Sequence, residues 1–248
     1  MKKRNILCFF LVVGLLFGLA TSYFYLTAER FVSVMAPAVE NQQLLLIIDA
    51  GHGGADGGAS DAMGREEDAV NLEIALRLEA LAALYGIQTE LTRREHDIDY
   101  PEDADSIRAK KVADTRRRVE QINAAQYAVV ISIHQNTYPA DYSVQGTQVL
   151  YANTEQSQAF AETMQEALTQ GLGLERSRAV RQVPSSVFLL NHIDTVAILV
   201  ECGFLSNPQE AERLHTANYQ LQIAASIFAG YRAMEESLRQ WYFGGSAQ

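Results

Sequence analysis

The sequence predicts an α/β fold: a single domain with a mostly parallel, twisted sheet of about six strands flanked by helices, preceded by an N-terminal transmembrane helix. Continuous apolar runs alternate with segments of helical character, which is typical of a parallel sheet covered by helices. Several of these runs end directly in polar or charged residues. A long uncharged segment stands apart at the start of the chain.

The length and composition of the chain set the domain organisation. Its 248 residues suffice for one such domain with a sizeable core and a short extra segment. With 48% hydrophobic and 20% charged residues, the chain is neither disordered nor membrane-embedded throughout. We expect an anchor in residues 1–28, a linker in 29–43, the α/β domain in 44–238 and a C-terminal tail in 239–248.

The anchor is predicted from the segment 5–27, which is uncharged and mostly apolar. This segment is long enough to span a bilayer as a helix. The basic residues 2–4 before it should stay in the cytoplasm, which places the domain on the extracytoplasmic side of the cell membrane. A cleaved signal peptide, which would make the protein secreted, is the alternative. We favour the anchor because the run exceeds the usual ~7–15 residues and Ala20–Ser22 is a poor cleavage site.

The charge of the chain and its cysteine content limit the kinds of binding partner and of metal site that it can have. The formal net charge is −10, and without the +3 of residues 2–4 it is −13. Such an acidic chain argues against nucleic acid as a partner. Of the two cysteines, Cys8 lies in the apolar segment and Cys202 in the domain, so a cysteine metal cluster is excluded. A metal site would have to use histidine and carboxylate.

The first elements of the domain follow from local pattern. The continuous apolar run Leu44–Ile48 predicts a strand buried on both faces, and the glycine-rich residues 49–64 predict a loop. Apolar residues between 70 and 84 predict a helix that stops at Gly86. Residues Ile87–Leu91 suit a second strand.

The middle of the chain is predicted as a charged helix followed by two strands. The helix covers Ile107–Asn123, and we interpret Arg116–Arg118 in it as a solvated face with a structural ion pair. The run Tyr127–Ile133 predicts a buried strand that delivers His134 at its carboxyl end. Residues Gly146–Ala152 alternate like a strand.

The last third is predicted as a helix, two short strands and a final helix. The first helix covers Glu155–Gln170. Short apolar runs at Ser186–Leu190 and Ala197–Val200 predict the strands. The final helix covers residues 208–238 and begins at a proline, a residue favoured in the first turn.

Polar side chains follow three of these strands: Asp49 to His52, His134 and Glu201. Ligands of parallel sheets bind beyond the carboxyl ends of the strands, so this convergence predicts a site. Catalytic zinc usually has three His or carboxylate ligands. Either histidine alone is more often structural, but together His52 and His134 indicate a metal. Asp49 or a backbone carbonyl could orient a ligating imidazole.

The third ligand and a base must be carboxylates. Glu66, Glu67 and Asp68 open a helix, where acids also serve as simple caps, and their spacing alone does not choose among them. Glu201 directly follows an apolar strand, where an acid is costly unless paired or used, so it is the candidate base for a metal-activated water. Cys202 is a weak candidate nucleophile because no neighbouring residue stabilises its thiolate.

Several spaced motifs occur in a fixed order along the domain. They are Asp49–Gly58, Glu67–Leu72, Ser132–Asn136, Gly146–Val149 and Leu199–Pro208. With these motifs the chain resembles the zinc-dependent N-acetylmuramoyl-L-alanine amidases of bacterial cell-wall remodelling, the amidase-3 family, over nearly all of residues 44–238.

The resemblance implies Zn²⁺ held by His52, Glu67 and His134, with Glu201 as the catalytic residue. Glu67 is chosen because the family pattern places Glu three residues before Val or Ile and five before Leu, as in Glu67–Leu72. The implied reaction is hydrolysis of the amide between N-acetylmuramic acid and L-alanine in peptidoglycan.

Within the family, the membrane-proximal start, short loops and lack of a wall-binding module look most like the germination-specific amidases of spore formers, which help make muramic δ-lactam in the spore cortex. An activating protein partner is compatible with this resemblance. The alternative is a catalytically silent, membrane-tethered peptidoglycan-binding protein, disfavoured because all four chemical residues are intact. A third hypothesis is an enzyme with the same zinc-binding fold that acts as a peptidase or a deacetylase.

Overall fold

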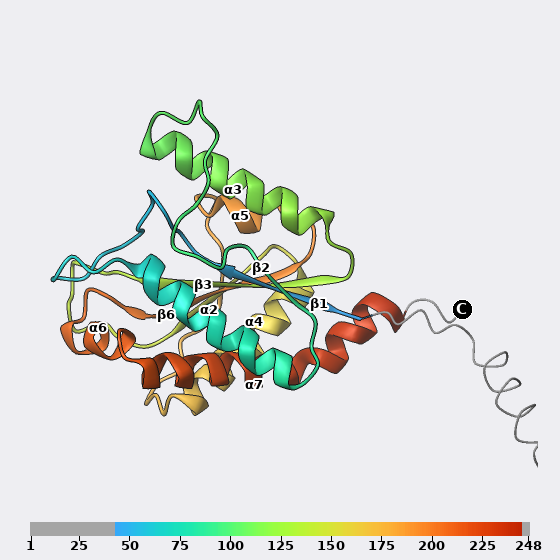
Figure 1. The fold of residues 1–248 in the computed structure, drawn as a ribbon. Coiled ribbons are helices and arrows are strands. Elements are labelled where there is room, and N and C mark those ends of the chain that lie inside the picture. The colour runs from blue at the N-terminus through green and yellow to red at the C-terminus, as the bar shows by residue number, and fades with distance from the viewer. Residues whose placement is uncertain (1–42, 245–248) are drawn as a thin grey trace, which may run out of the picture. The chain divides into compact units, whose positions relative to one another are not determined.

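One six-stranded sheet forms the centre of the domain in the computed structural model, which describes residues 43–244 (Figure 1). The strands are β1 (Leu45–Ala50), β2 (Thr89–Leu91), β3 (Ala128–Asn136), β4 (Gln148–Tyr151), β5 (Arg181–Gln182) and β6 (Val196–Phe204). The helices are α2 (Glu67–Leu84), α3 (Ile107–Ala124), α4 (Glu155–Gly171), α5 (Phe188–Asn191), α6 (Pro208–Leu214) and α7 (Ala217–Phe243). The predicted α/β domain is confirmed.

The sheet is mostly parallel, with strand order β2-β1-β3-β6-β4-β5. Strands β2, β1, β3 and β6 run parallel to one another, whereas β4 runs antiparallel to β6 and carries β5 parallel to itself. The carboxyl ends of β1, β3 and β6 therefore meet at one edge. There Asp49 pairs with Ser132, and His134 pairs with Glu201.

Helices cover both faces of the sheet (Figure 1). One core packs α2, α4 and α7 against strand residues such as Ile131, and the other packs α3 and α5 against residues such as Val130 and Leu199. Because side chains alternate between faces along a strand, His134 and Glu201 share the face of Val130 and Leu199. The side chains of His134 and Glu201 therefore both lie on the face of the sheet that α3 and α5 cover.

The strand expected at Ser186–Leu190 is wrong, because these residues lead into the short helix α5. A short apolar run fits a strand and a buried helix turn equally well. Leu189 and Leu190 are buried together, and the Asn191 amide donates to two preceding carbonyls at 2.9 and 2.6 Å. The neighbouring strand is instead β5, whose two residues are exposed and give no apolar signal.

The single helix expected over residues 208–238 is two helices, α6 and α7. The break follows His215, because the Thr216 hydroxyl accepts the backbone N–H of Tyr219 and begins a new helix. Helix α7 continues to Phe243, so the expected domain boundary at 238 falls inside it.

The predicted anchor at 5–27 and its linker lie outside the described residues. Between residues 43 and 244, none of the helices combines the length and apolar character needed to cross a membrane.

Candidate metal centre

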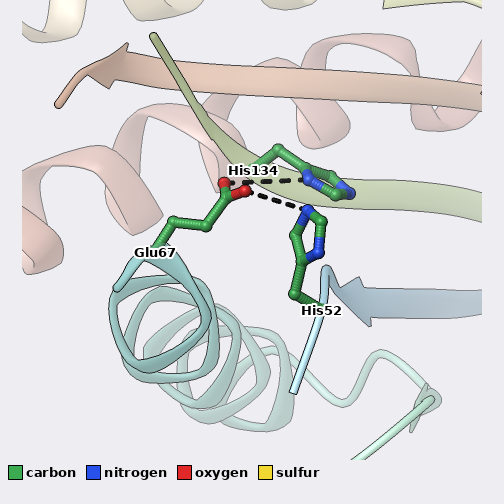
Figure 2. A group of neighbouring side chains, drawn as sticks. All are labelled: His52, Glu67 and His134. Carbon is green, nitrogen blue, oxygen red and sulfur yellow. Dashed lines mark ion pairs between the residues drawn. The ribbon is translucent and has the colours of Figure 1, made fainter. Parts of the chain in front are cut away.

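Three predicted side chains converge above the carboxyl edge of the sheet (Figure 2). His52 comes from the loop after β1, Glu67 from the first turn of α2 and His134 from β3. One nitrogen or oxygen atom of each lies within 4.8 Å of the others. His52 Nε2 is 2.9 Å from Glu67 Oε1, and His134 Nδ1 is 3.9 Å from Glu67 Oε2. Both imidazoles thus face one carboxylate.

The structure separates the three acids that the sequence left open at the start of α2. Glu66 is exposed at the N-cap position. Asp68 is buried, and its Oδ2 lies 2.6 Å from Nδ1 of His96. Of these acids, Glu67 is the one that joins the histidine cluster.

The Glu67 carboxylate is held from two sides. It accepts the backbone N–H of Ala59 at 3.0 Å and that of Gln135 at 2.7 Å. Burial opposes its charge, but the hydrogen bond to His52 and the charge of His134 hold the pKa of Glu67 at about 2. Gly58 makes room for it: a Cβ there would lie 2.2 Å from Oε1, and the φ of +72° also favours glycine.

The His134 ring packs directly over the backbone of Gly51. A Cβ on Gly51 would lie 2.3 Å from the ring, so glycine permits this approach. Burial lowers the pKa of His134 to about 4, although the charge of Glu67 opposes that shift. The imidazole is therefore neutral near pH 7, which is the form that binds metal ions.

His52 adopts a left-handed backbone conformation with φ 59°, which is uncommon outside glycine and clusters at functional sites. Its Nδ1 lies 2.8 Å from Oδ2 of Asp56, which in turn lies 2.9 Å from Nζ of Lys111. Burial disfavours the imidazolium, but hydrogen bonds to Asp56 and Glu67 raise the pKa of His52 to about 9. Asp56, which the sequence did not single out, therefore orients this ring.

Asp49, one of the two groups considered for orienting an imidazole, has other partners. Its carboxylate accepts from Arg118 at 2.8 Å, Thr92 at 2.7 Å and Ser132 at 2.5 Å. Burial raises its pKa, but the charge of Arg118 and these hydroxyl donors bring the pKa of Asp49 down to about 2. Asp49 thus fixes the end of β1 rather than a histidine.

Two buried arginines hold the backbone that carries His52. Arg118 donates to the carbonyl oxygens of Ala50 and His52, both at 2.6 Å. Arg93 donates to those of Ala50 and Gly51, both at 3.0 Å. The strained loop is therefore fixed by hydrogen bonds to its own carbonyls.

The interpretation of Arg116–Arg118 is confirmed for the first two residues and for the ion pair. Arg116 and Arg117 are exposed, whereas Arg118 is buried and lies 2.7 Å from Asp114. The contact of Arg118 with the His52 loop was not predicted, because adjacent arginines on a helix look alike in sequence.

Glu201 lies beside the cluster. Its Cα pairs with that of His134 across β6 and β3. The buried Oε2 atom has no hydrogen bond within residues 43–244. Burial, reinforced by the charge of Glu67, raises the pKa of Glu201 to about 8. It faces a cavity of about 280 Å³ shared with both histidines and walled by α3 and α5.

Cys202 points to the other side of the sheet. It is fully buried in the core beneath α2, α4 and α7. Burial raises the pKa of its thiol above the ordinary value, which disfavours a nucleophilic thiolate as the sequence predicted.

The donor set fits zinc. Two imidazoles and one carboxylate are a common ligand set of catalytic zinc, which keeps one further position for water or substrate. The Oε2 atom of Glu201, which has no hydrogen bond among the described residues, belongs to a side chain that lines the same cavity as both histidines.

Comparison with known proteins gives consistent matches. Residues 46–233 match the family described as N-acetylmuramoyl-L-alanine amidase. A germination-specific N-acetylmuramoyl-L-alanine amidase of Bacillus subtilis is 33% identical over 187 residues, 75% of this chain and 77% of that protein. The CwlD amidase of Clostridioides difficile, solved in complex with the GerS lipoprotein, is 30% identical with TM-score 0.75 and covers 79% of this chain and 100% of that one. The amidase AmiC2 of Nostoc punctiforme is 28% identical with TM-score 0.66, covering 78% and 97%.

Proposed function

This chain belongs to the N-acetylmuramoyl-L-alanine amidase family, and we propose that zinc held by His52, Glu67 and His134, with Glu201 as the acid–base residue, carries its amidase activity on peptidoglycan. The bond cleaved is the amide between N-acetylmuramic acid and L-alanine. The observation that carries this assignment is the half-buried carboxylate of Glu201 beside the three clustered donor groups, with an Oε2 atom that has no hydrogen bond within residues 43–244.

The ligand atoms in this proposal are those that face one another: Nε2 of His52, the carboxylate of Glu67 and Nδ1 of His134. Bound zinc supplies Lewis-acid chemistry and makes a water molecule more acidic. The chain contributes the orientation of these donors, through Asp56 behind His52 and the backbone N–H groups behind Glu67.

Glu201 moves the proton. Hydrolysis of an amide removes a proton from the attacking water and delivers one to the leaving nitrogen, here that of L-alanine. A carboxyl whose pKa is raised to about 8 by burial holds a proton near neutral pH. A cation beside it, such as bound zinc, would favour the ionised form. Glu201 can therefore accept the first proton and return it to the leaving group.

The setting that we propose is the extracytoplasmic side of the cell membrane, with residues 5–27 as a tether. The amidase relatives act on peptidoglycan, which lies outside the cytoplasm. Similarity to a germination-specific amidase supports spore-cortex peptidoglycan, and muramic δ-lactam formation, as the finer role. The CwlD amidase is in complex with a lipoprotein, which supports an activating protein partner for this chain as well.

Digestion of purified peptidoglycan tests the proposal. The zinc-loaded wild type should release peptides with a free L-alanine amino terminus and leave glycan strands without peptides, as read by mass spectrometry. Glu201→Gln should slow release by about a thousandfold, because the proton carrier is lost, while keeping its zinc. The control Glu120→Gln changes an exposed carboxylate on α3 and should act like the wild type. Cleavage within the peptide, release of acetate or full activity of Glu201→Gln would contradict the assignment.

A further inference from the structure

A second groove lies on the β4–β5 side of the metal centre. Its volume is about 520 Å³. Aromatic side chains from the loop after β3 and the end of β6 form part of its wall, and the adjoining positions come from β4, β5 and the segment before β5. The residues used below are Tyr138, Gln148, Leu150, Arg178, Arg181 and Phe204.

The groove lies on the same face of the sheet as the metal centre. Gln148 on β4 pairs with Glu201 on β6, and Leu150 pairs with Arg181 on β5. Residues paired across neighbouring strands point to the same face, and so do residues two apart on one strand. Arg181 therefore shares a face with Glu201. The two positions are two strand spacings apart across the sheet and two residues apart along it, a separation of roughly 12 Å.

The groove is positively charged in an acidic protein. The chain carries a formal net charge of −10, yet no Asp or Glu is among the described residues that line this groove, and two arginines are. Arg178 is already engaged: it donates to the Gln145 carbonyl at 2.9 Å, lies 5.2 Å from the Phe204 ring centroid and faces the charge of Glu210.

Arg181, in contrast, is available to a ligand. It is exposed, and within residues 43–244 its guanidinium has neither an ion pair nor a hydrogen bond. A guanidinium binds a carboxylate through two parallel hydrogen bonds, which gives orientation as well as affinity. Tyr138, 50% exposed, lines the same groove and offers a ring for apolar parts of a ligand.

We propose that this groove binds the peptide part of the substrate and that Arg181 determines specificity by binding a free carboxylate one or two residues beyond the scissile amide. The inference rests on the proposed function, because the metal centre defines where that amide lies. Two residues of extended peptide cover roughly 7 Å, which together with the reach of an arginine side chain spans the separation from Glu201. The stem peptide of peptidoglycan is an acidic peptide, and its charge complements the groove. The enzyme therefore prefers free-acid stem peptides over amidated ones.

Paired substrates test this preference in the zinc-loaded full chain. The probes are muramoyl-L-alanyl-D-glutamate with both glutamate carboxylates free and the same compound with both carboxylates amidated. The wild type should cleave the free acid with a kcat/KM roughly tenfold higher than the amide, because only the free acid forms a charged hydrogen-bonded pair with Arg181. Arg181→Gln should lose this preference, whereas Arg181→Glu should prefer the amide. The control Arg176→Gln alters an exposed arginine of the same segment outside the groove and should keep the wild-type preference.

Equal rates of the wild type on both compounds, or a preference that survives in Arg181→Gln, would overturn the proposal. Calorimetric binding of the dipeptide L-alanyl-D-glutamate and its diamide separates this failure from failure of the proposed function. If the wild type cleaves neither compound, the amidase assignment fails. The groove assignment then stands only if the wild type binds the free acid more tightly than the amide and Arg181→Gln does not.

Discussion

Two carboxylates of the metal centre are held in different protonation states by their surroundings. Glu67 accepts hydrogen bonds from two backbone N–H groups and from His52, and its pKa is about 2. Glu201 is half-buried, its buried Oε2 has no hydrogen-bond partner within the described residues, and its pKa is about 8. Carboxyl groups whose environments push their pKa values apart commonly divide the roles of a site. This contrast supports Glu67 as a ligand and Glu201 as a proton carrier.

Asp56→Asn should weaken zinc binding by about 10- to 100-fold, because the carboxylate behind His52 orients the ring and raises its basicity. Competition with a chromophoric zinc chelator measures the change. Asp97→Asn removes an exposed carboxylate and should leave zinc affinity as in the wild type. An unchanged affinity of Asp56→Asn would mean that the contact with His52 does not support metal binding.

The residues of the site were predictable where they directly follow a strand that the sequence itself indicates. His134 and Glu201 follow apolar strands, and His52 follows another within a glycine-rich loop, so their convergence could be foreseen. The choice among Glu66, Glu67 and Asp68 could not, because it depends on how α2 is rotated against β3. Family spacing pointed to Glu67, in agreement with the geometry.

At the scale of elements, contacts between distant segments fix the site, and these are invisible in sequence. Arg118 projects from α3 to the loop after β1, and Asp49 joins the ends of β1 and β3. Neither contact follows from periodicity. The long apolar strands β1, β3 and β6 were predictable for the opposite reason, because their signal is local. The short helix α5 and the two-residue strand β5 lack a distinct local period, and their assignment was wrong or missing.

Asp49→Asn should destabilise the zinc-free protein by about 3 kcal/mol at pH 7, because it leaves the buried Arg118 with one carboxylate fewer. The pH dependence has a definite sign. The folded pKa of Asp49, about 2, lies below its unfolded value near 3.9, so its contribution is present above about pH 4 and is lost as the pH falls toward 2.

Urea unfolding in the presence of a chelator, at several pH values, measures this contribution. The free energy of unfolding of the wild type should fall more steeply between pH 4 and pH 2 than that of Asp49→Asn. Parallel curves for the two proteins would show that Asp49 is not a stabilising charge.

At the scale of the whole molecule, the chain combines an acidic domain with a basic, apolar start. The domain over residues 43–244 holds the candidate site by itself, and its helices lack a membrane-spanning segment. The tether proposed for residues 5–27 is supported by the sequence alone: the apolar segment is long enough to span a bilayer, and basic residues precede it.

The tether predicts how the full chain fractionates in bacteria. The protein should pellet with membranes, resist alkaline carbonate extraction and retain its amino terminus by mass spectrometry, whereas a variant lacking residues 5–27 should not pellet. A shorter, soluble chain cut after the apolar segment would establish a cleaved signal peptide instead.

The position of zinc tests the central claim most directly. Crystals of the zinc-loaded protein, measured at the zinc absorption edge, should show one anomalous peak per chain between His52 Nε2, the Glu67 carboxylate and His134 Nδ1, with the carboxylate of Glu201 facing it. In Glu67→Gln this peak should be lost, and in the neighbouring variant Glu66→Gln it should remain. A fully loaded protein whose zinc lies elsewhere, or whose peak survives in Glu67→Gln, would contradict the account.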